Sequence, residues 1–120
     1  MFSKISIDHK IWMVTGQGEG IIGEGKWLLL KTIKEKGSLM AASKELNISY
    51  RKAWGDIRKT EQLLGIPLLD KTRGGKDGGA SNLTKEGMLF VEVFENAKNK
   101  VANAVQVAGL ELQQLLENAK

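Results

Sequence analysis

Cysteine is absent from the 120-residue chain, and proline and histidine occur once each. Without cysteine the chain can form neither disulfides nor cysteine-ligated zinc sites, and thiolate catalysis is excluded. No apolar run approaches the roughly 20 residues that a membrane-spanning helix requires, and the N-terminal stretch MFSKISIDHK lacks the apolar core of a secretory signal. These absences favour a soluble, cytoplasmic protein with no membrane partner.

Side chains for catalysis or metal binding are also scarce. His9 is the only histidine, it has no acidic or histidine partner in register, and no paired carboxylates fall at a convincing spacing. We therefore expect no enzyme, no metal site and no cofactor. The length fits one domain with a modest core.

Positive charge is concentrated in the middle of the chain. Between Lys26 and Lys76 there are twelve Lys and Arg against five Asp and Glu, or +7, whereas the remaining residues carry six basic and nine acidic side chains, or −3. A basic middle segment is typical of a surface that faces a polyanion such as nucleic acid. A lysine-rich helix that is merely solvated is the other reading.

The N-terminal residues predict a β-hairpin over 5–22. The alternation between Ile5 and Val14 predicts a strand, TGQGEG a turn, and Ile21 and Ile22 a short return strand. One face of the first strand would carry Ile5, Ile7, His9, Ile11 and Met13, and the other Trp12 and Val14.

Three helices are predicted next, of which the second and third form a helix-turn-helix. The first spans 26–36 and ends at Gly37; Ser38 caps the second, SLMAASKELN; Ser49 caps the third, YRKAWGDIRKTEQLL, which ends at Gly65. Two short helices joined by a three- or four-residue turn are the layout of a DNA-reading helix-turn-helix. A helical hairpin with basic residues outside is the alternative.

The third helix carries the expected DNA contacts. Its first turn supplies Ser49, Tyr50, Arg51 and Lys52, and Arg58 and Lys59 follow further along. These side chains, with the positive end of the helix dipole, can reach base edges and phosphates.

The run GGKDGG at 74–79 follows this helix and predicts the tip of a wing. An extended segment from Ile66, a loop from Arg73 to Asn82, and a returning strand through Leu83 would form a second hairpin. Glycines let backbone lie against a groove, while nearby cations hold phosphates. The expected cations are Lys71, Arg73 and Lys76. A nucleotide-phosphate loop is disfavoured, since the Gly-Lys-Ser/Thr ending is missing.

A last helix, capped by Thr84, is predicted from Lys85 nearly to Lys120. Its apolar residues step by threes and fours, close to a coiled-coil seam, which favours pairing with a second copy. The predicted seam comprises Phe90, Phe94, Ala97, Val101, Ala104, Ala108, Leu112 and Leu115. The alternative is a helix folded back at Gly109 onto its own core.

The segments GSLMAASKELNISYRKAW and LLGIPLLDKTRGGKDGGASNLTKEG resemble the N-terminal winged helix-turn-helix domain of the ModE-type molybdate-responsive transcriptional regulators, which is akin to the LysR-type DNA-binding domain. The resemblance covers roughly residues 10–87. It implies that residues 49–52 enter the major groove, that Arg73 and Lys76 serve the wing, and that the last helix makes a homodimer. Ser38 and Trp54 join the candidate DNA-binding set, although the position of Trp54 beside the Ala53 and Ile57 stripe favours packing.

The predicted organisation is mainly α with small β hairpins: a winged helix-turn-helix at 1–83 and a dimerisation helix at 84–120. Regulators of this type continue into oxyanion-binding domains, whereas this chain ends with its long helix. We therefore expect a stand-alone DNA-binding regulator that reads an inverted repeat in double-stranded DNA and takes any signal from a separate effector-sensing protein. A winged-helix module that docks a partner protein through the last helix is the alternative function.

Overall fold

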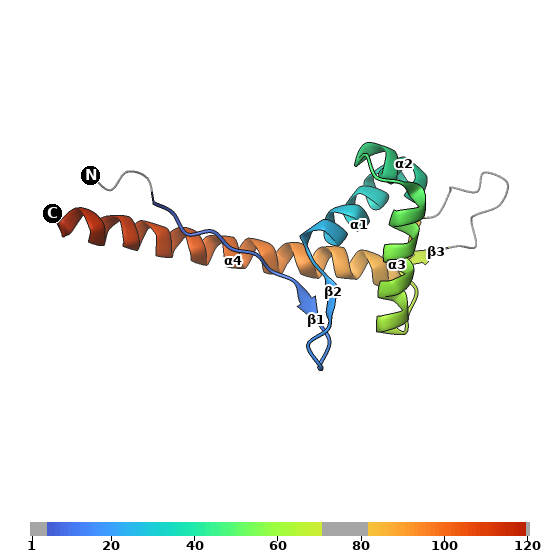
Figure 1. Ribbon diagram of the computed structural model, residues 1–120, viewed down its shortest axis with the longest axis horizontal. Coiled ribbons are helices and arrows are strands. Elements are labelled where there is room, and N and C mark those ends of the chain that lie inside the picture. The colour runs from blue at the N-terminus through green and yellow to red at the C-terminus, as the bar shows by residue number, and fades with distance from the viewer. Residues whose placement is uncertain (1–4, 71–81, 120) are drawn as a thin grey trace.

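The computed structural model of the chain describes residues 5–70 and 82–119. Its described elements form a winged helix-turn-helix that continues into one long helix, as predicted (Figure 1). In chain order they are β1 (Met13–Val14), β2 (Gly20–Ile22), α1 (Glu24–Lys36), α2 (Leu39–Glu45), α3 (Tyr50–Leu64), β3 (Leu69–Asp70), β4 (Asn82–Leu83) and α4 (Lys85–Asn118).

The hydrophobic core lies where α1, α2 and α3 meet the first turns of α4. Leu30, Ile33 and Ile57 are fully buried there, and Phe94 of α4 joins them with only 1% of its surface exposed. Trp27 of α1 stacks on Phe94, with ring centroids 5.8 Å apart. Two ion pairs between α1 and α4 flank this stack, Lys31 with Glu95 at 3.2 Å and Glu24 with Lys98 at 3.4 Å. Together these contacts fix the first turns of α4 to α1.

The helix ends follow the local signals in the sequence. The Ser38 and Ser49 hydroxyls accept hydrogen bonds from the backbone N–H groups of Ala41 and Lys52, each at 3.0 Å, so both predicted N-caps are confirmed. Gly37 and Gly65 end α1 and α3 with φ of 88° and 74°, backbone that glycine adopts without strain. Asn47 follows α2 with φ of 56°, a left-handed backbone conformation that asparagine tolerates better than most residues.

The start of α1 differs from the prediction. The helix begins at Glu24, two residues before the expected Lys26, with Gly23 as an N-cap that makes no side-chain hydrogen bond. Glu24 stabilises this extra turn in two ways, because its carboxylate lies at the positive end of the helix dipole and also pairs with Lys98 of α4.

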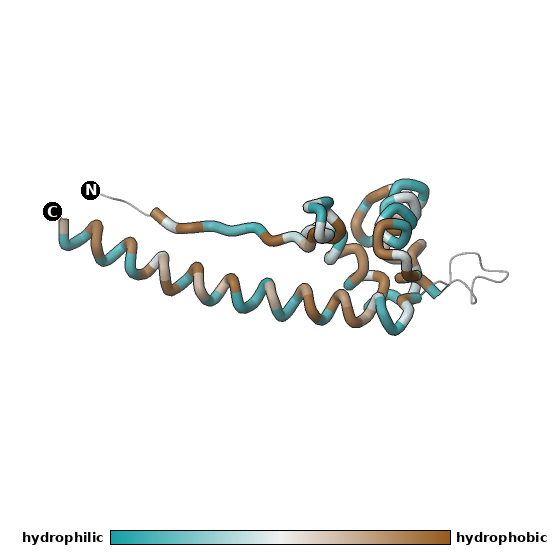
Figure 2. The backbone as a smooth tube through the Cα atoms, turned by 90° about the horizontal axis from the view of Figure 1, so that it is seen from below, coloured by the Kyte–Doolittle hydropathy of each residue, from teal (hydrophilic) through white to brown (hydrophobic). Residues whose placement is uncertain are grey.

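The N-terminal hairpin exists, but its first strand is much shorter than predicted. β1 covers only Met13–Val14 and pairs antiparallel with β2, with Met13 opposite Ile22. Residues 5–12 form no strand, because β2 is only three residues long and offers them no partner. They run extended beside α4 instead (Figures 1 and 2), where Ile5 and Ile7 remain 45% and 42% exposed.

The base of the predicted wing is confirmed as a two-stranded antiparallel ladder. Leu69 pairs with Leu83 and Asp70 with Asn82. The expected loop lies almost entirely at 71–81, outside the described residues. Thr84 joins the ladder to the next helix, because its hydroxyl donates to the Pro67 carbonyl at 2.9 Å and accepts from the Gly87 N–H at 3.0 Å.

α4 is a single uninterrupted helix of 34 residues, so the alternative of a fold-back at Gly109 is wrong. At 1.5 Å per residue it is about 51 Å long, and the molecule measures 67 × 32 × 21 Å. The buried residues of α4, Gly87, Val91 and Phe94, all belong to its first third. Hydrophobic residues nevertheless continue along the helix towards its C-terminal end (Figure 2).

Candidate nucleic-acid interface

α3 lies on the far side of the core from α4 (Figures 1 and 2), and the residues on its outward side are mostly basic. The inward side of α3 carries Ala53, Ile57 and Thr60, all of which are fully buried. The opposite stripe is exposed, and at helical spacing it carries Arg51, Gly55, Arg58, Lys59 and Gln62. A helix with a buried apolar face and a cationic outer face has the form required to lie in the major groove of DNA.

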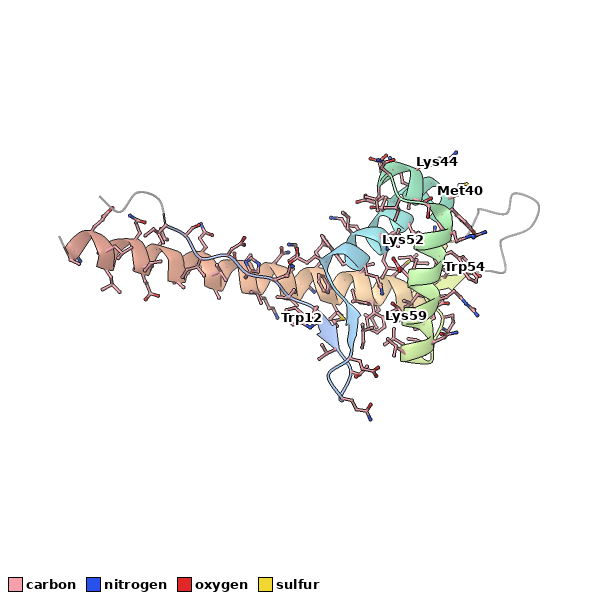
Figure 3. The ribbon with its side chains drawn as sticks, viewed as in Figure 1. Trp12, Met40, Lys44, Lys52, Trp54 and Lys59 are labelled. Atoms are coloured by element: carbon pink, nitrogen blue, oxygen red, sulfur yellow. The ribbon has the colours of Figure 1, made fainter. Side chains whose placement is uncertain are left out.

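Trp54 departs from the expectation that it packs beneath the helix. Its side chain is 41% exposed, and the Arg58 guanidinium lies over its ring at 5.2 Å from the centroid (Figure 3). The physical reason is the turn of the helix: Trp54 is one residue, or about 100°, from the buried Ala53. A cation held on an exposed indole is pre-positioned, since fewer Arg58 rotamers remain to be fixed on binding.

Ser38 and Ser49, the two serines of the predicted DNA-binding set, both act as helix N-caps. Each of the Ser38 and Ser49 oxygens accepts a backbone N–H within its own helix. A hydroxyl that accepts in this way keeps its hydrogen, so either serine can still donate one hydrogen bond to a phosphate oxygen. The caps therefore place both hydroxyls at helix N-termini, where an anion is favoured.

Tyr50 and Lys52 differ in how accessible they are. Tyr50 is half-buried and packs against the core, so its ring supports the first turn of α3. Lys52 is exposed and pairs with Asp56 one turn along, Nζ to Oδ2 at 3.2 Å. An exposed i, i+4 pair contributes only about 0.3–0.5 kcal/mol, so Lys52 can exchange Asp56 for a phosphate at small cost.

The structure adds Lys44 and Gly55 to the predicted set, and it places Lys59, which the sequence located along the third helix, on the same face. Lys59 shares the exposed face of α3, and Lys44 is exposed on α2, close to Met40 (Figure 3). The signal available for Lys59 and Gly55 was spacing, since residues 51, 55, 59 and 62 recur at three- and four-residue intervals. A lysine on α2 carries no such signal.

A buried carboxylate connects α3 to the base of the wing. Glu61 is only 8% exposed, and its Oε2 accepts the backbone N–H groups of Leu68 at 2.7 Å and Leu69 at 3.1 Å. This acceptor holds the start of β3 against the last turns of α3. The predicted wing cations Lys71, Arg73 and Lys76 lie outside the described residues.

Lys26 belongs to α1, and its side chain reaches across to α3. Its Nζ donates to the Thr60 hydroxyl at 2.6 Å. Burial lowers the pKa of Lys26 below 10.5, an effect that the nearby Asp56 charge opposes and that Lys59 and Lys52 reinforce. Lys26 therefore ties the two helices together rather than adding to the exposed basic face.

The predicted dimer seam of α4 divides into covered and open positions. Phe94 belongs to the core of its own chain, and we therefore remove it from the seam. Ala104 is exposed, and Leu115 is 68% exposed. The half-buried positions are Phe90, Ala97, Val101, Ala108 and Leu112.

Residues 5–70 and 82–119 show no sign of a metal site or a membrane span. Within those ranges, no cluster of three or more histidine, aspartate or glutamate side chains is arranged to hold a metal ion. None of the helices described there combines the length and apolar character needed to cross a membrane.

Comparison with known proteins places the helix-turn-helix in a family. Residues 26–88, just over half of the chain, match the model of the bacterial regulatory helix-turn-helix proteins of the lysR family. The DNA-binding transcriptional dual regulator ModE of Escherichia coli K12 is 36% identical over 67 residues, which cover 56% of this chain and 26% of that protein. The molybdenum-pterin-binding protein MopB of Rhodobacter capsulatus is 33% identical over 73 residues, 61% of this chain and 27% of that protein.

The chain thus spans about a quarter of the length of the curated relatives it matches. The family match begins within α1, includes α2 and α3, and ends in the first turn of α4. It therefore contains the basic face of α3 and the base of the wing. The chain belongs to the lysR family of bacterial regulatory helix-turn-helix proteins.

Proposed function

We propose that this chain is a sequence-specific transcriptional regulator that binds double-stranded DNA through α3 and the wing, as a homodimer joined by α4. The exposed basic face of α3 carries the proposal. Arg51, Arg58 and Lys59 lie on that face, and the opposite side of α3 is buried against the core. The match of residues 26–88 to the lysR-family model and the likeness to a DNA-binding regulator support it.

The proposed contacts divide into two kinds. Arg51 and the Ser49 hydroxyl, at the start of α3, would reach base edges in the major groove and select the sequence. Lys52, Arg58 and the wing cations Arg73 and Lys76 would contact phosphates and hold the register. The Glu61 link between α3 and β3 would keep these two sets in a fixed relation.

The extent of exposed surface supports a dimer. The chain exposes 8222 Å², whereas a compact monomer of 13.2 kDa exposes about 6,400 Å². Its radius of gyration, 18.6 Å, likewise exceeds the roughly 14 Å of a compact domain this long. The excess surface, about 1,800 Å², is enough for one side of a standard protein interface, which takes about 800 Å². We assign the second copy to α4, because exposed apolar side chains continue there to Leu115.

A two-fold dimer has a direct consequence for the DNA sequence. Two copies of α3 related by a two-fold axis would enter successive major grooves about 34–36 Å apart. The operator would then be an inverted repeat with half-sites one helical turn apart.

Selection of bound duplexes from a random DNA library, at two salt concentrations, tests the function. We expect an inverted repeat and an affinity that falls steeply with salt, since phosphate contacts release counterions. Binding without an enriched motif would contradict sequence-specific reading. No binding at either salt concentration would instead favour the alternative of a winged-helix module that docks a partner protein.

The two kinds of contact are separated by comparing Arg51→Ala with Lys76→Ala. Arg51→Ala should relax specificity at one or two base pairs, with a loss of about 1–3 kcal/mol. Lys76→Ala should weaken binding to all sequences alike and reduce the salt slope by about one. Lys100→Ala, which removes an exposed charge from α4, is the control. Equal relaxation of specificity by Arg51→Ala and Lys76→Ala would contradict the division.

Two leucines of α4 test the dimer with a matched control. Leu115 is 68% exposed and belongs to the predicted seam, whereas Leu110 is 66% exposed and lies about 140° away around the helix. In sedimentation equilibrium, Leu115→Glu should dissociate the dimer, and Leu110→Glu should leave it intact. Dissociation by both variants, or by neither, would contradict the seam.

We assign DNA reading to this chain, because the exposed basic face of α3 suits DNA, and we assign oxyanion binding to other proteins. Equilibrium dialysis with molybdate and with tungstate tests it. Tight one-to-one binding of either anion would contradict the assignment.

A further inference from the structure

Gly55 occupies the middle of the exposed face of α3. It lies two residues, or about 200° around the helix, from both Ala53 and Ile57, which are fully buried. Gly55 is therefore nearly opposite the core, and it is exposed. The helix presents bare backbone at the centre of its outward face.

Nothing in residues 5–70 and 82–119, which the structure describes, accounts for a glycine at this position. Glycine is among the poorest helix formers, and it is usually retained either for positive φ or for close approach of another group. The described glycines with positive φ are Gly18, Gly37 and Gly65. A Cβ built on Gly55 meets nothing within 4 Å, whereas one built on Gly87 would lie 2.6 Å from the Leu68 carbonyl oxygen.

The surroundings of Gly55 indicate what approaches it. Arg51 lies one turn before it, Lys59 one turn after it, and Arg58 three residues on; all three are exposed. A cationic face with no side chain at its centre lets the helix backbone come close to a polyanion, while the cations on either side reach its charged groups. The major groove of DNA, with phosphates along its edges and base edges at its floor, offers both kinds of contact.

We propose that Gly55 is the point of closest approach between α3 and DNA, and that its missing side chain sets how deeply the helix enters the major groove. This assignment rests on the proposed function. At this depth Arg51 reaches base edges, while Arg58 and Lys59 reach the flanking phosphates. A methyl group at position 55 lifts the helix and lengthens all of these contacts together.

Gly55→Ala should have opposite effects on folding and on DNA binding. Alanine is the better helix former, so the ratio of folded to unfolded protein should rise about fivefold in urea titrations. The affinity for the selected DNA sequence should fall by about tenfold or more, because several contacts lengthen at once. Binding to random DNA at low salt should change less than twofold, since it depends on charge and not on depth.

Gly109→Ala is the matched control. It makes the same substitution inside α4, where a Cβ also meets nothing within 4 Å. It should stabilise the fold and leave DNA affinity unchanged. Equal affinity of Gly55→Ala and wild type for the selected sequence would overturn the assignment of Gly55 and leave the proposed function standing. Absence of DNA binding by the wild type would overturn both.

Discussion

Replacing Glu61 tests whether one buried carboxylate holds the wing to the recognition helix. Its Oε2 accepts two backbone N–H groups, at 2.7 Å from Leu68 and 3.1 Å from Leu69. Leu68 and Leu69 are 0% and 3% exposed, so water cannot readily replace the lost acceptor. Glu61→Ala should therefore leave two unsatisfied donors in the interior, beside a cavity.

The expected loss follows from the strength of these bonds. A hydrogen bond to a charged group contributes about 1.5–3 kcal/mol, and two bonds to one oxygen are not additive. We expect Glu61→Ala to lower the free energy of unfolding by about 3 kcal/mol, a factor of roughly 150 in the folded-to-unfolded ratio. Glu61→Gln keeps a carbonyl oxygen for the same donors and should lose about 1 kcal/mol.

The assay is urea unfolding followed by circular dichroism, at one fixed protein concentration because dimerisation would also shift the midpoint. Glu95→Ala is the control: its carboxylate pairs with Lys31 at 3.2 Å but is 43% exposed, so the loss should stay below about 1 kcal/mol. A loss below about 1 kcal/mol for Glu61→Ala, or an equal loss for Glu95→Ala, would show that the Glu61 carboxylate does not hold β3 to α3.

Two further substitutions probe the junction of α4 and the role of Lys26. Gly87→Ala should destabilise the fold by about 1–3 kcal/mol in the same assay, because its Cβ would lie 2.6 Å from the Leu68 carbonyl oxygen and 3.2 Å from the Leu83 Cβ; unchanged stability would mean that α4 can shift freely. Lys26→Met should change the pH dependence of stability. Because burial lowers the pKa of Lys26, the unfolded chain binds more protons between that lowered pKa and the ordinary 10.5. The wild type should therefore gain stability relative to Lys26→Met as the pH rises towards 10.5, and a constant difference would contradict this.

Local chemistry explains why the helix boundaries could be predicted from sequence. The Ser38 and Ser49 caps act on an N–H three residues away, and Gly37 and Gly65 end helices through their own φ angles. These signals operate within one turn of backbone. They therefore have the same effect whatever the rest of the chain does.

Where the sequence-based prediction was wrong, the observed structure depends on contacts between different segments of the chain. The first strand stops short because β2 offers it only three residues of pairing, and α1 starts early because Glu24 reaches Lys98 of α4. Phe94 fitted the seam by spacing alone, yet it is buried because Trp27 of α1 stacks on it. Spacing gives the angle of a residue around its helix, and only docking decides which angle faces the core.

The sequence alone was therefore enough to predict the order of the helices, their limits apart from the start of α1, the basic character of α3 and the long apolar periodicity of α4. All of these arise from neighbours a few residues apart. Tertiary structure decided the exposure of Trp54, the burial of Glu61 beneath the wing, and the placement of Gly55 opposite the core. Each of these depends on the direction in which a helix packs, because burial and close approach are set by segments far apart in the chain.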